Sequence, residues 1–221
     1  MLTTRQRLIE AAAQGFADHG IQTASLVEIT RQAGQRNRGA VHYHFRSREG
    51  LLAAIIDEHA EFMSARQGEL LVGAMERPDD DVASVVAVIV RACSELAEAS
   101  VSGRNYLKIV SEIAEQDPAT YSSEVEAALT RCGNYDAYTL LGERVLRAVG
   151  GLEEEVRDHR LLLMTSFVFG SIARRIRGLE MAGMPGVRRQ LDNDRFVEEL
   201  VAMATAMLSV PVPVSVASAP M

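Results

Sequence analysis

Apolar residues recur at helical spacing along most of this chain, whereas the alternation typical of strands is sparse. Leu8, Ala12 and Phe16 form the first apolar stripe, with further small and apolar residues beside it. Gly20 follows at the position where a glycine commonly ends a helix. The pattern therefore predicts an amphipathic helix near the start of the chain and favours an all-helical fold.

Three more helices are predicted directly after the first. Ser25 stands where an N-cap belongs, ahead of an apolar stripe that Gly34 ends. A third, short helix is predicted over about residues 37–43. Ser47 is the next predicted N-cap, and the apolar residues after it predict one longer helix that reaches Met63.

The rest of the chain also has helical periodicity, interrupted by turn residues. Pro78 ends one helix, and an aspartate among the three residues after it can cap the next helix and complement its dipole. Further helices are predicted at about 82–100, 103–116, 122–149, 153–181 and 193–208. The predicted separators are Gly103, residues 117–118, residues 150–151 and residues 183–186. Residues 209–221 contain three prolines and no charge, which is typical of a disordered tail.

Charge is unevenly distributed along the chain. The formal net charge is −7, yet residues 25–48 hold five arginines, with no acidic residue between Ile29 and Arg48. Residues 1–60 carry a net charge of +1, and the remaining residues carry −8. A short cationic segment on an acidic protein offers a local docking place for a polyanion.

The order of elements in this cationic segment matches the needs of a helix–turn–helix. A helix enters the DNA major groove at a fixed angle only when a second helix braces it through a tight turn. Gly34 supplies the backbone freedom for that turn. Arginine can bond guanine, and asparagine or glutamine can bond adenine, at the start of the helix that enters the groove. The candidate DNA contacts are Ser25, Gln35, Arg36, Asn37, Arg38, Gly39, His42, Tyr43 and Arg48. The alternative is a solvated basic turn in an ordinary helical bundle.

These elements define a domain organisation. We predict an all-α fold in which residues 1–47 form a three-helix helix–turn–helix domain that binds DNA. Residues 48–208 are predicted to form a larger helical domain, and residues 209–221 a disordered tail.

Many spaced residues of the first domain agree with a known family. The segments are Arg7-Leu-Ile-Glu-Ala-Ala, Phe16-Ala-Asp-His-Gly20, Ala24-Ser25-Leu-Val-Glu-Ile29, Ala33-Gly34 and Tyr43-His44-Phe45-Arg-Ser-Arg48-Glu-Gly-Leu51-Leu52. Over about residues 5–56 they resemble the DNA-binding head of the TetR/AcrR family of transcriptional regulators. No motif identifies the remainder, although its length and helical layout resemble that family's effector-binding and dimerisation domain.

The resemblance implies a homodimeric regulator of operator DNA, usually a repressor that a small molecule releases. It implies phosphate contacts for Ser25 and Arg48, base contacts for residues 35–39, and backbone contacts for His42 and Tyr43. The sequence departs from the family pattern in two places. The turn at residues 35–38 is one residue longer, and a histidine stands at position 42 where the family has a tyrosine. A neutral His42 would donate one hydrogen bond, whereas a charged His42 would make phosphate binding depend on pH.

A single short recognition helix binds weakly, so two copies about 34–36 Å apart are expected. Two late apolar stripes are the candidate dimer surface, and two such pairs can form an intermolecular four-helix bundle. The interface candidates are Leu161, Met164, Val168, Ile172, Phe196, Leu200, Met203 and Met207. The alternative is that these stripes face the chain's own core.

The middle helices hold the apolar and aromatic residues that an effector pocket needs. The candidates are Phe62, Met63, Tyr106, Ile109, Ile113, Tyr135, Tyr138 and Phe167. Tyrosine can orient a ligand through its hydroxyl, and methionine adapts to irregular shapes. Such a lining favours a small, mainly apolar effector with a few polar handles. The alternative for each of these residues is ordinary core packing.

Other functions are less well supported by the sequence. It shows no nucleophile–base pair, phosphate-binding glycine loop or metal cluster, so we expect no enzyme activity, no metal and no cofactor. Cys93 and Cys132 have no metal-ligand spacing, which fits a reduced, cytoplasmic setting. Leu161 to Ala173 is too short to span a bilayer, so no membrane partner is expected. A helical protein–protein adaptor and an effector-independent regulator remain alternatives.

Overall fold

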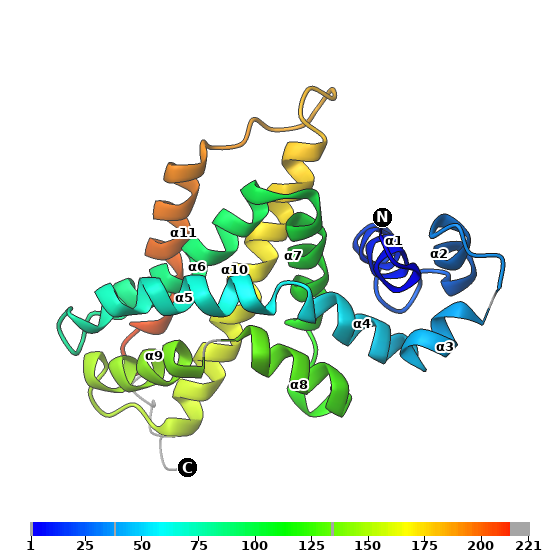
Figure 1. Ribbon diagram of the computed structural model, residues 1–221. Coiled ribbons are helices and arrows are strands. Elements are labelled where there is room, and N and C mark those ends of the chain that lie inside the picture. The colour runs from blue at the N-terminus through cyan, green and yellow to red at the C-terminus, as the bar shows by residue number, and fades with distance from the viewer. Residues whose placement is uncertain (1, 38, 134, 213–221) are drawn as a thin grey trace, which may run out of the picture.

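The computed structural model describes residues 2–37, 39–133 and 135–212, and every regular element in those ranges is a helix (Figure 1). A three-helix head precedes a larger helical body, so the predicted fold class is confirmed. The helices are α1 (Thr4–His19), α2 (Leu26–Gln32), α3 (Ala40–Phe45), α4 (Arg48–Asp57), α5 (Ala60–Met75), α6 (Val82–Ala99), α7 (Val101–Ile113), the 3-10 turn η1 (Pro118–Thr120), α8 (Ser123–Cys132), α9 (Tyr135–Ala148), α10 (Glu154–Glu180) and α11 (Asn193–Leu208).

The predicted caps of the head are confirmed. Helix α1 ends at Gly20, whose φ of 86° lies in the left-handed region that glycine adopts without strain. The Ser25 hydroxyl accepts a hydrogen bond from the Glu28 amide, and the Ser47 hydroxyl accepts one from the Gly50 amide. These caps fix where α2 and α4 begin. The apolar faces of the four helices then close one small core that includes Leu8, Phe16, Ile29, Val41 and Leu51.

The single long helix predicted after Ser47 is instead two helices, α4 and α5. The chain bends at Glu58 and His59, and the His59 ring turns inward to lie 4.8 Å, centroid to centroid, from the Tyr106 ring. Its Nε2 is 3.2 Å from the Ser102 hydroxyl of α7. Burial lowers the pKa of His59, which favours the neutral imidazole in this position. Contacts with a distant helix therefore outweigh the local preference for a continuous helix.

Two other predicted boundaries are wrong. The helix expected over residues 122–149 is divided into α8 and α9, because extended backbone at Gly133 ends α8. Gly103 does not separate helices but lies inside α7, which starts at Val101 after the cap Ser100. A Cβ at position 103 would come 2.3 Å from the Leu96 carbonyl oxygen. Gly103 therefore permits a close approach of α6 and α7 rather than a turn.

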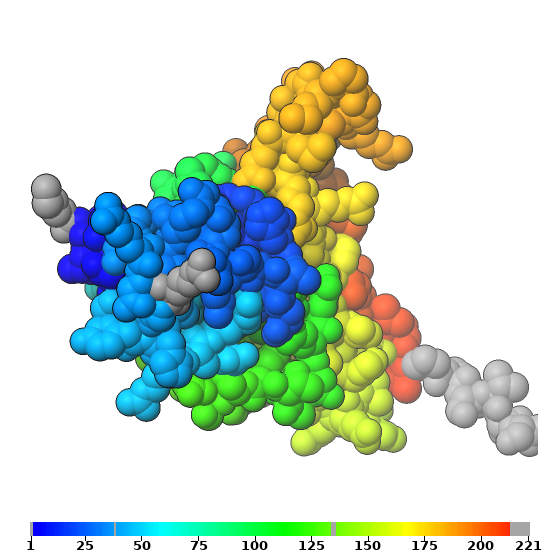
Figure 2. Space-filling model, turned by 90° about the vertical axis from the view of Figure 1, so that its right-hand side faces the viewer, coloured from blue at the N-terminus to red at the C-terminus, as the bar shows by residue number. Residues whose placement is uncertain are grey.

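The body is built around α10, which crosses it from end to end and packs against α7, α9 and α11 (Figure 1). Helix α11 packs against α6, and α5 lies against α6 and α8. The head lies at one side of the body, where α1 packs on α7 and α4 packs on α1, α3 and α8. Figure 2 views the molecule from the head, with the connection between α10 and α11 projecting at one edge. None of the described helices is long and apolar enough to cross a membrane.

Candidate functional site

The turn between α2 and α3 is formed by a glycine and an asparagine. Gly34 has a φ of 71°, and the Gln35 backbone amide donates to the Thr30 carbonyl. The Asn37 side-chain oxygen accepts a hydrogen bond from the Gly39 amide, and the Ala40 amide donates to the Asn37 carbonyl. Asn37 thus forms an Asx turn, so α3 begins at Ala40 rather than at the predicted Asn37. The chain ahead of α3 is a polar turn and not a first helical turn.

Helix α3 divides its residues between the core and the outer surface. Ala40, Val41 and Phe45 are buried against the head, whereas His42 is exposed and 82% of Tyr43 is exposed. The predicted contact residues Arg36, Asn37 and Gly39 are also exposed. The side-chain amide of Gln35 donates back to the Ala33 carbonyl, and Arg38 lies outside the described residues.

Two predicted phosphate contacts have roles within the protein. The Ser25 hydroxyl caps α2, as described above. Arg48 does not extend outward: its guanidinium donates to the Ile21 carbonyl at 2.6 Å and lies over the Phe16 ring. Arg48 therefore has a structural role in the head, and its phosphate contact stays a prediction. Its position in the first turn of α4 directs it to the loop that follows α1.

Charge pairing within the head leaves a cationic outer edge. Arg31 donates to both carboxylate oxygens of Glu28, at 2.8 and 2.6 Å, and this pairing lowers the pKa of Glu28 to about 2. Arg36 and Arg46 make no ion pair with any carboxylate of the described residues. Their charges therefore flank the exposed face of α3 without an internal counter-ion.

The head is tied to the body by a carboxylate that the sequence pattern did not indicate. Both oxygens of Glu112 on α7 lie 3.0 Å from the Ile21 amide nitrogen, which donates to them. The Ile21 carbonyl is the group that Arg48 binds, so both backbone polar groups of this one residue are held. Asn105 of α7 also donates to Gln14 of α1 at 3.0 Å. Displacement of α7 would therefore be transmitted directly to the head.

Removing the Glu112 carboxylate is expected to loosen this connection. In Glu112→Ala the Ile21 amide loses its acceptor, so its hydrogen exchange should accelerate roughly tenfold, the equivalent of about 1.4 kcal/mol for a charge-assisted bond. Glu115→Ala is the matched control, because Glu115 is exposed near the same end of α7. Equal exchange rates at Ile21 in wild type and Glu112→Ala would contradict this role.

A cavity of about 180 Å³ lies between the middle helices of the body. Met63, Tyr106, Ile113 and Tyr138 of the predicted set line it. Ile109 is fully buried in the core, Phe62 is 39% exposed, and Phe167 is not among the lining residues. The side chain of Tyr135 lies outside the described residues. The lining residues that the sequence analysis missed are Gln67, Val110, Ala114, Tyr121, Leu129, Cys132, Gly133, Thr165 and Phe169.

The cavity has polar handles but no charged lining residue. Burial raises the pKa of Tyr138 to about 12 and that of Tyr106 well above its usual value, so both phenols are neutral hydrogen-bonding groups. An adjoining cavity of about 300 Å³ shares Tyr121, Leu129, Gly133 and Tyr138 with the first and has Glu126 in its wall. Apart from Glu126, the lining residues of the two spaces are apolar or neutral.

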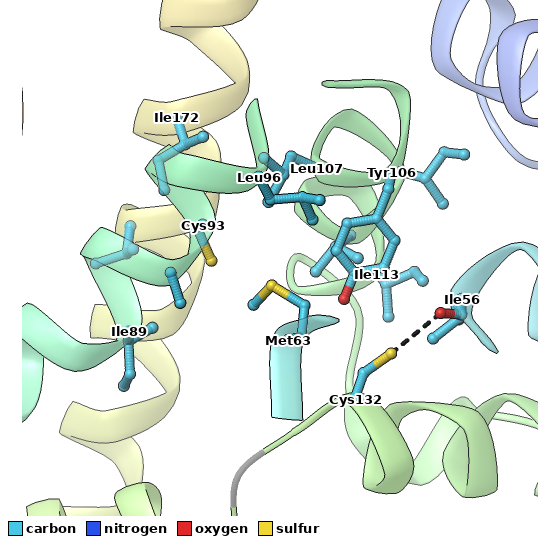
Figure 3. Close-up of a cluster of buried hydrophobic side chains, with 14 of the residues drawn as sticks. Ile56, Met63, Ile89, Cys93, Leu96, Tyr106, Leu107, Ile113, Cys132 and Ile172 are labelled. Atoms are coloured by element: carbon cyan, nitrogen blue, oxygen red, sulfur yellow. Dashed lines mark hydrogen bonds between the residues drawn. The ribbon is translucent and has the colours of Figure 1, made fainter. Parts of the chain in front are cut away.

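One lining residue of the inner cavity is bonded to α4, the helix that leads to the head. Cys132, at the end of α8, donates from its sulfur to the Ile56 carbonyl of α4 at 3.1 Å (Figure 3). The neighbouring Arg131 forms two hydrogen bonds of 2.8 and 2.9 Å with Asp57. The hydroxyl of Tyr106 interacts with the Cys132 thiol. A molecule in the cavity would therefore contact α7 and α8, the two helices that hold the head.

The predicted dimer stripe faces mainly inward. Met164, Val168, Ile172 and Leu200 are buried in the chain's own core. The apolar periodicity of α10 and α11 identified the sides that face the chain's own core, because the most continuous apolar stripe lies there. The outer sides are also partly apolar, with Leu163 50% and Met203 48% exposed and Met207 half-buried, whereas Leu161, Phe167 and Phe196 are half-buried against the core.

Sequence comparisons match the head. Residues 8–55 match the family model described as bacterial regulatory proteins, tetR family. The A-factor receptor protein of Streptomyces griseus is 36% identical over 29% of this chain and 23% of its own length. The transcriptional repressor AcnR of Corynebacterium glutamicum is 32% identical over 34% of this chain and 43% of its own length. The matches thus span less than half of each of these relatives.

Comparisons of structure extend over the whole fold. AibR, solved with isovaleryl coenzyme A and operator DNA, superposes with a TM-score of 0.54, covering 91% of this chain and 97% of AibR at 16% identity. SmeT, the repressor of a Stenotrophomonas maltophilia multidrug efflux pump, gives a TM-score of 0.52, covering 96% and 98% of the two chains at 19% identity. At these identities the superpositions establish the shared fold. Residues 8–55 are thus similar to the DNA-binding domain of the tetR family, and the fold of the chain is that of these solved structures.

Proposed function

We propose that this protein is a sequence-specific transcriptional regulator that binds a palindromic operator as a homodimer and is released by a small, mainly apolar effector. The outer face of the head is the main support for this proposal. His42 and Tyr43 are exposed on α3, beside the exposed and unpaired Arg36, while Val41 and Phe45 anchor the helix from behind. A short helix held in this way suits insertion into a major groove.

Each exposed group has chemistry that suits a part of the DNA. Arg36 and Asn37 offer donors that match the base edges of guanine and adenine, with about 1–3 kcal/mol of discrimination for each good bidentate pair. The Tyr43 hydroxyl and the His42 ring suit phosphate oxygens at the groove edge. The Nδ1 of His42 is 2.7 Å from the Arg46 carbonyl oxygen and donates its proton to it, so Nε2 can donate to a phosphate oxygen only when the ring is protonated.

The outer sides of α10 and α11 support a homodimer. Leu163, Met203 and Met207 give an apolar surface that a second copy can cover with the same surface. These residues replace the buried Met164, Val168, Ile172 and Leu200 in the proposed interface. Pairing of α10 and α11 with their symmetry mates would form a four-helix bundle and hold two heads apart.

The cavity that Tyr106 and Tyr138 line supports an effector-driven switch. An effector that prefers a wider cavity would displace α7 and α8, and the contacts of Glu112 and Cys132 would pass this movement to the head and α4. The two recognition helices would then lose the spacing that the operator requires. Such coupling is reciprocal and typically amounts to about 1–3 kcal/mol between effector and DNA.

Binding to DNA tests the proposal through variants of the exposed surface. Arg36→Ala and Tyr43→Ala should each weaken binding to a selected operator by about tenfold or more, because each removes a groove or phosphate contact. Affinity of the wild type should fall steeply with salt. Arg91→Ala is the control, since Arg91 is an exposed arginine on α6, outside the head.

Gel shifts at several salt concentrations provide the measurement. An adaptor that retains the head without reading DNA would show no sequence-selective shift, and this result would contradict the proposal. A regulator that needs no effector would show the shift but would keep its DNA affinity with every molecule that occupies the cavity. AcnR, which resembles the head in sequence, is a transcriptional repressor, in keeping with a selective shift.

A further inference from the structure

A second cavity, of about 370 Å³, is lined by residues of α6, α7, α10 and α11. Its floor is apolar and is formed by Ile172, Ile176, Leu179 and Phe196. It shares no lining residue with the cavity that contains Tyr106 and Tyr138. The two spaces also differ in charge, because charged side chains line only the larger one.

Two arginines in this cavity lack a carboxylate partner within the described chain. Arg175 donates from one nitrogen to the Leu191 carbonyl at 2.6 Å, and its guanidinium lies 4.6 Å from the centroid of the Phe196 ring. Arg104, on the facing helix α7, donates from one nitrogen to the Ala97 carbonyl at 3.0 Å. Neither forms an ion pair with a described carboxylate, so each keeps several unused N–H donors.

The acidic residues near these arginines form no ion pair with either of them among the described residues. Glu180 is engaged by Lys108, whose Nζ lies 2.7 Å from each of its oxygens. Glu98 is exposed at the rim and, together with Asp192, acts on Arg175 only at a distance. Burial lowers the pKa of Arg175, so its charge has lost part of its hydration. The two guanidinium groups therefore lie at an apolar floor without a direct carboxylate contact from the described residues.

We propose that this cavity is a second small-molecule site that binds an amphipathic carboxylate. Arg104 and Arg175 hold the carboxylate, since guanidinium groups match its planar geometry. The apolar part of the ligand lies on Ile172, Ile176 and Leu179. The side chain of Asn193 is positioned to contribute as well: its oxygen accepts from the Ser94 hydroxyl at 2.9 Å, which leaves its amide nitrogen as a donor at the cavity wall.

This site differs from the proposed effector pocket in its consequences. Its walls include the end of α10 and the first residue of α11, the two helices proposed to pair in the dimer. A ligand here would act on the dimer scaffold, whereas one in the neutral cavity acts on α7 and α8. An acidic molecule and an uncharged molecule would therefore act on this protein through separate sites.

Calorimetric titration with octanoate tests the proposal directly. We expect one octanoate bound per chain, and Arg175→Gln and Arg104→Gln should each weaken its binding at least tenfold. Octan-1-ol, which has the same chain length without the charge, should bind at least tenfold more weakly than octanoate to this site. Arg177→Gln is the matched control, because Arg177 is exposed on the same helix and does not line the cavity.

Three further measurements distinguish binding in this cavity from binding elsewhere on the chain and from loss of the fold. Tyr138→Phe alters the neutral cavity and should leave octanoate affinity unchanged. Thermal unfolding of the arginine variants checks that their folds persist, and Arg175→Lys should restore part of the affinity through its charge. The proposal is overturned if octanoate does not bind, if a second copy of the chain covers the cavity and blocks it, or if both Gln variants bind octanoate as the wild type does.

Discussion

Replacing Arg144 by methionine is expected to lower the free energy of unfolding by about 3 kcal/mol or more, since each buried acceptor that loses its donor costs about 1–3 kcal/mol. Arg144 is 1% exposed. Its guanidinium donates to the Ala74 carbonyl at 2.6 Å, to the Ser84 hydroxyl at 2.7 Å and to the Asp81 carbonyl at 2.9 Å. It thus satisfies the end of α5 and the start of α6 from a position on α9, and methionine would leave these acceptors buried without donors.

Arg147→Met on the same helix is the control for this prediction. Arg147 is half exposed and pairs with Asp79 at 3.3 Å and Glu143 at 3.6 Å. Such surface pairs contribute about 0–1 kcal/mol, so the control should change stability little. Urea unfolding followed by circular dichroism measures both. Similar unfolding midpoints for the two variants would show that Arg144 does not tie α5, α6 and α9 together.

Gly50→Ala should destabilise the head by about 1–3 kcal/mol, the usual cost of forcing extra atoms into a packed site. A Cβ at position 50 would lie 2.2 Å from the Phe45 carbonyl oxygen, at the end of α3. Because this obstacle is backbone, no side-chain rotation relieves the clash. Either α3 or the start of α4 must shift, so operator affinity should fall together with stability.

Gly68→Ala separates this clash from the general effect of replacing a helical glycine. No atom lies within 4 Å of the position that its Cβ would take, on α5. Alanine there should raise stability by up to about 1 kcal/mol through helix propensity alone. Thermal unfolding and gel shifts of both variants provide the measurement. A Gly50→Ala protein that gains stability as Gly68→Ala does, and binds DNA normally, would contradict the close approach of α3 and α4.

Features that depend on neighbouring residues could be predicted from the sequence. Ser25 and Ser47 cap helices because the hydroxyl and the amide it binds are three residues apart, and Gly20 ends α1 through its own backbone conformation. The exposed residues of α3 and of the turn before it were also predicted from such local signals. The start of α3 was placed three residues too early, because the Asn37 side chain can cap a turn as readily as begin a helix.

Features that depend on distant partners could not be predicted in this way. The bend at His59 depends on Ser102, and the Glu112 contact joins residues 91 positions apart. Periodicity identified the apolar stripe that contains Met164 and Leu200, but an apolar stripe has the same pattern whether it meets its own core or a second copy. The pocket was predicted in part, because aromatic composition indicated Tyr106 and Tyr138, whereas Gln67 and Phe169 have no local signal.

The central claim is that the head reads a specific DNA sequence as one half of a symmetric pair. Selection of bound duplexes from a random pool by the full-length protein tests it most directly. We expect recovery of one inverted repeat, with half-sites one helical turn or a whole multiple of it apart, and loss of that enrichment when Arg36→Ala replaces the wild type. Recovery of no common sequence, or equal enrichment by Arg36→Ala, would contradict it.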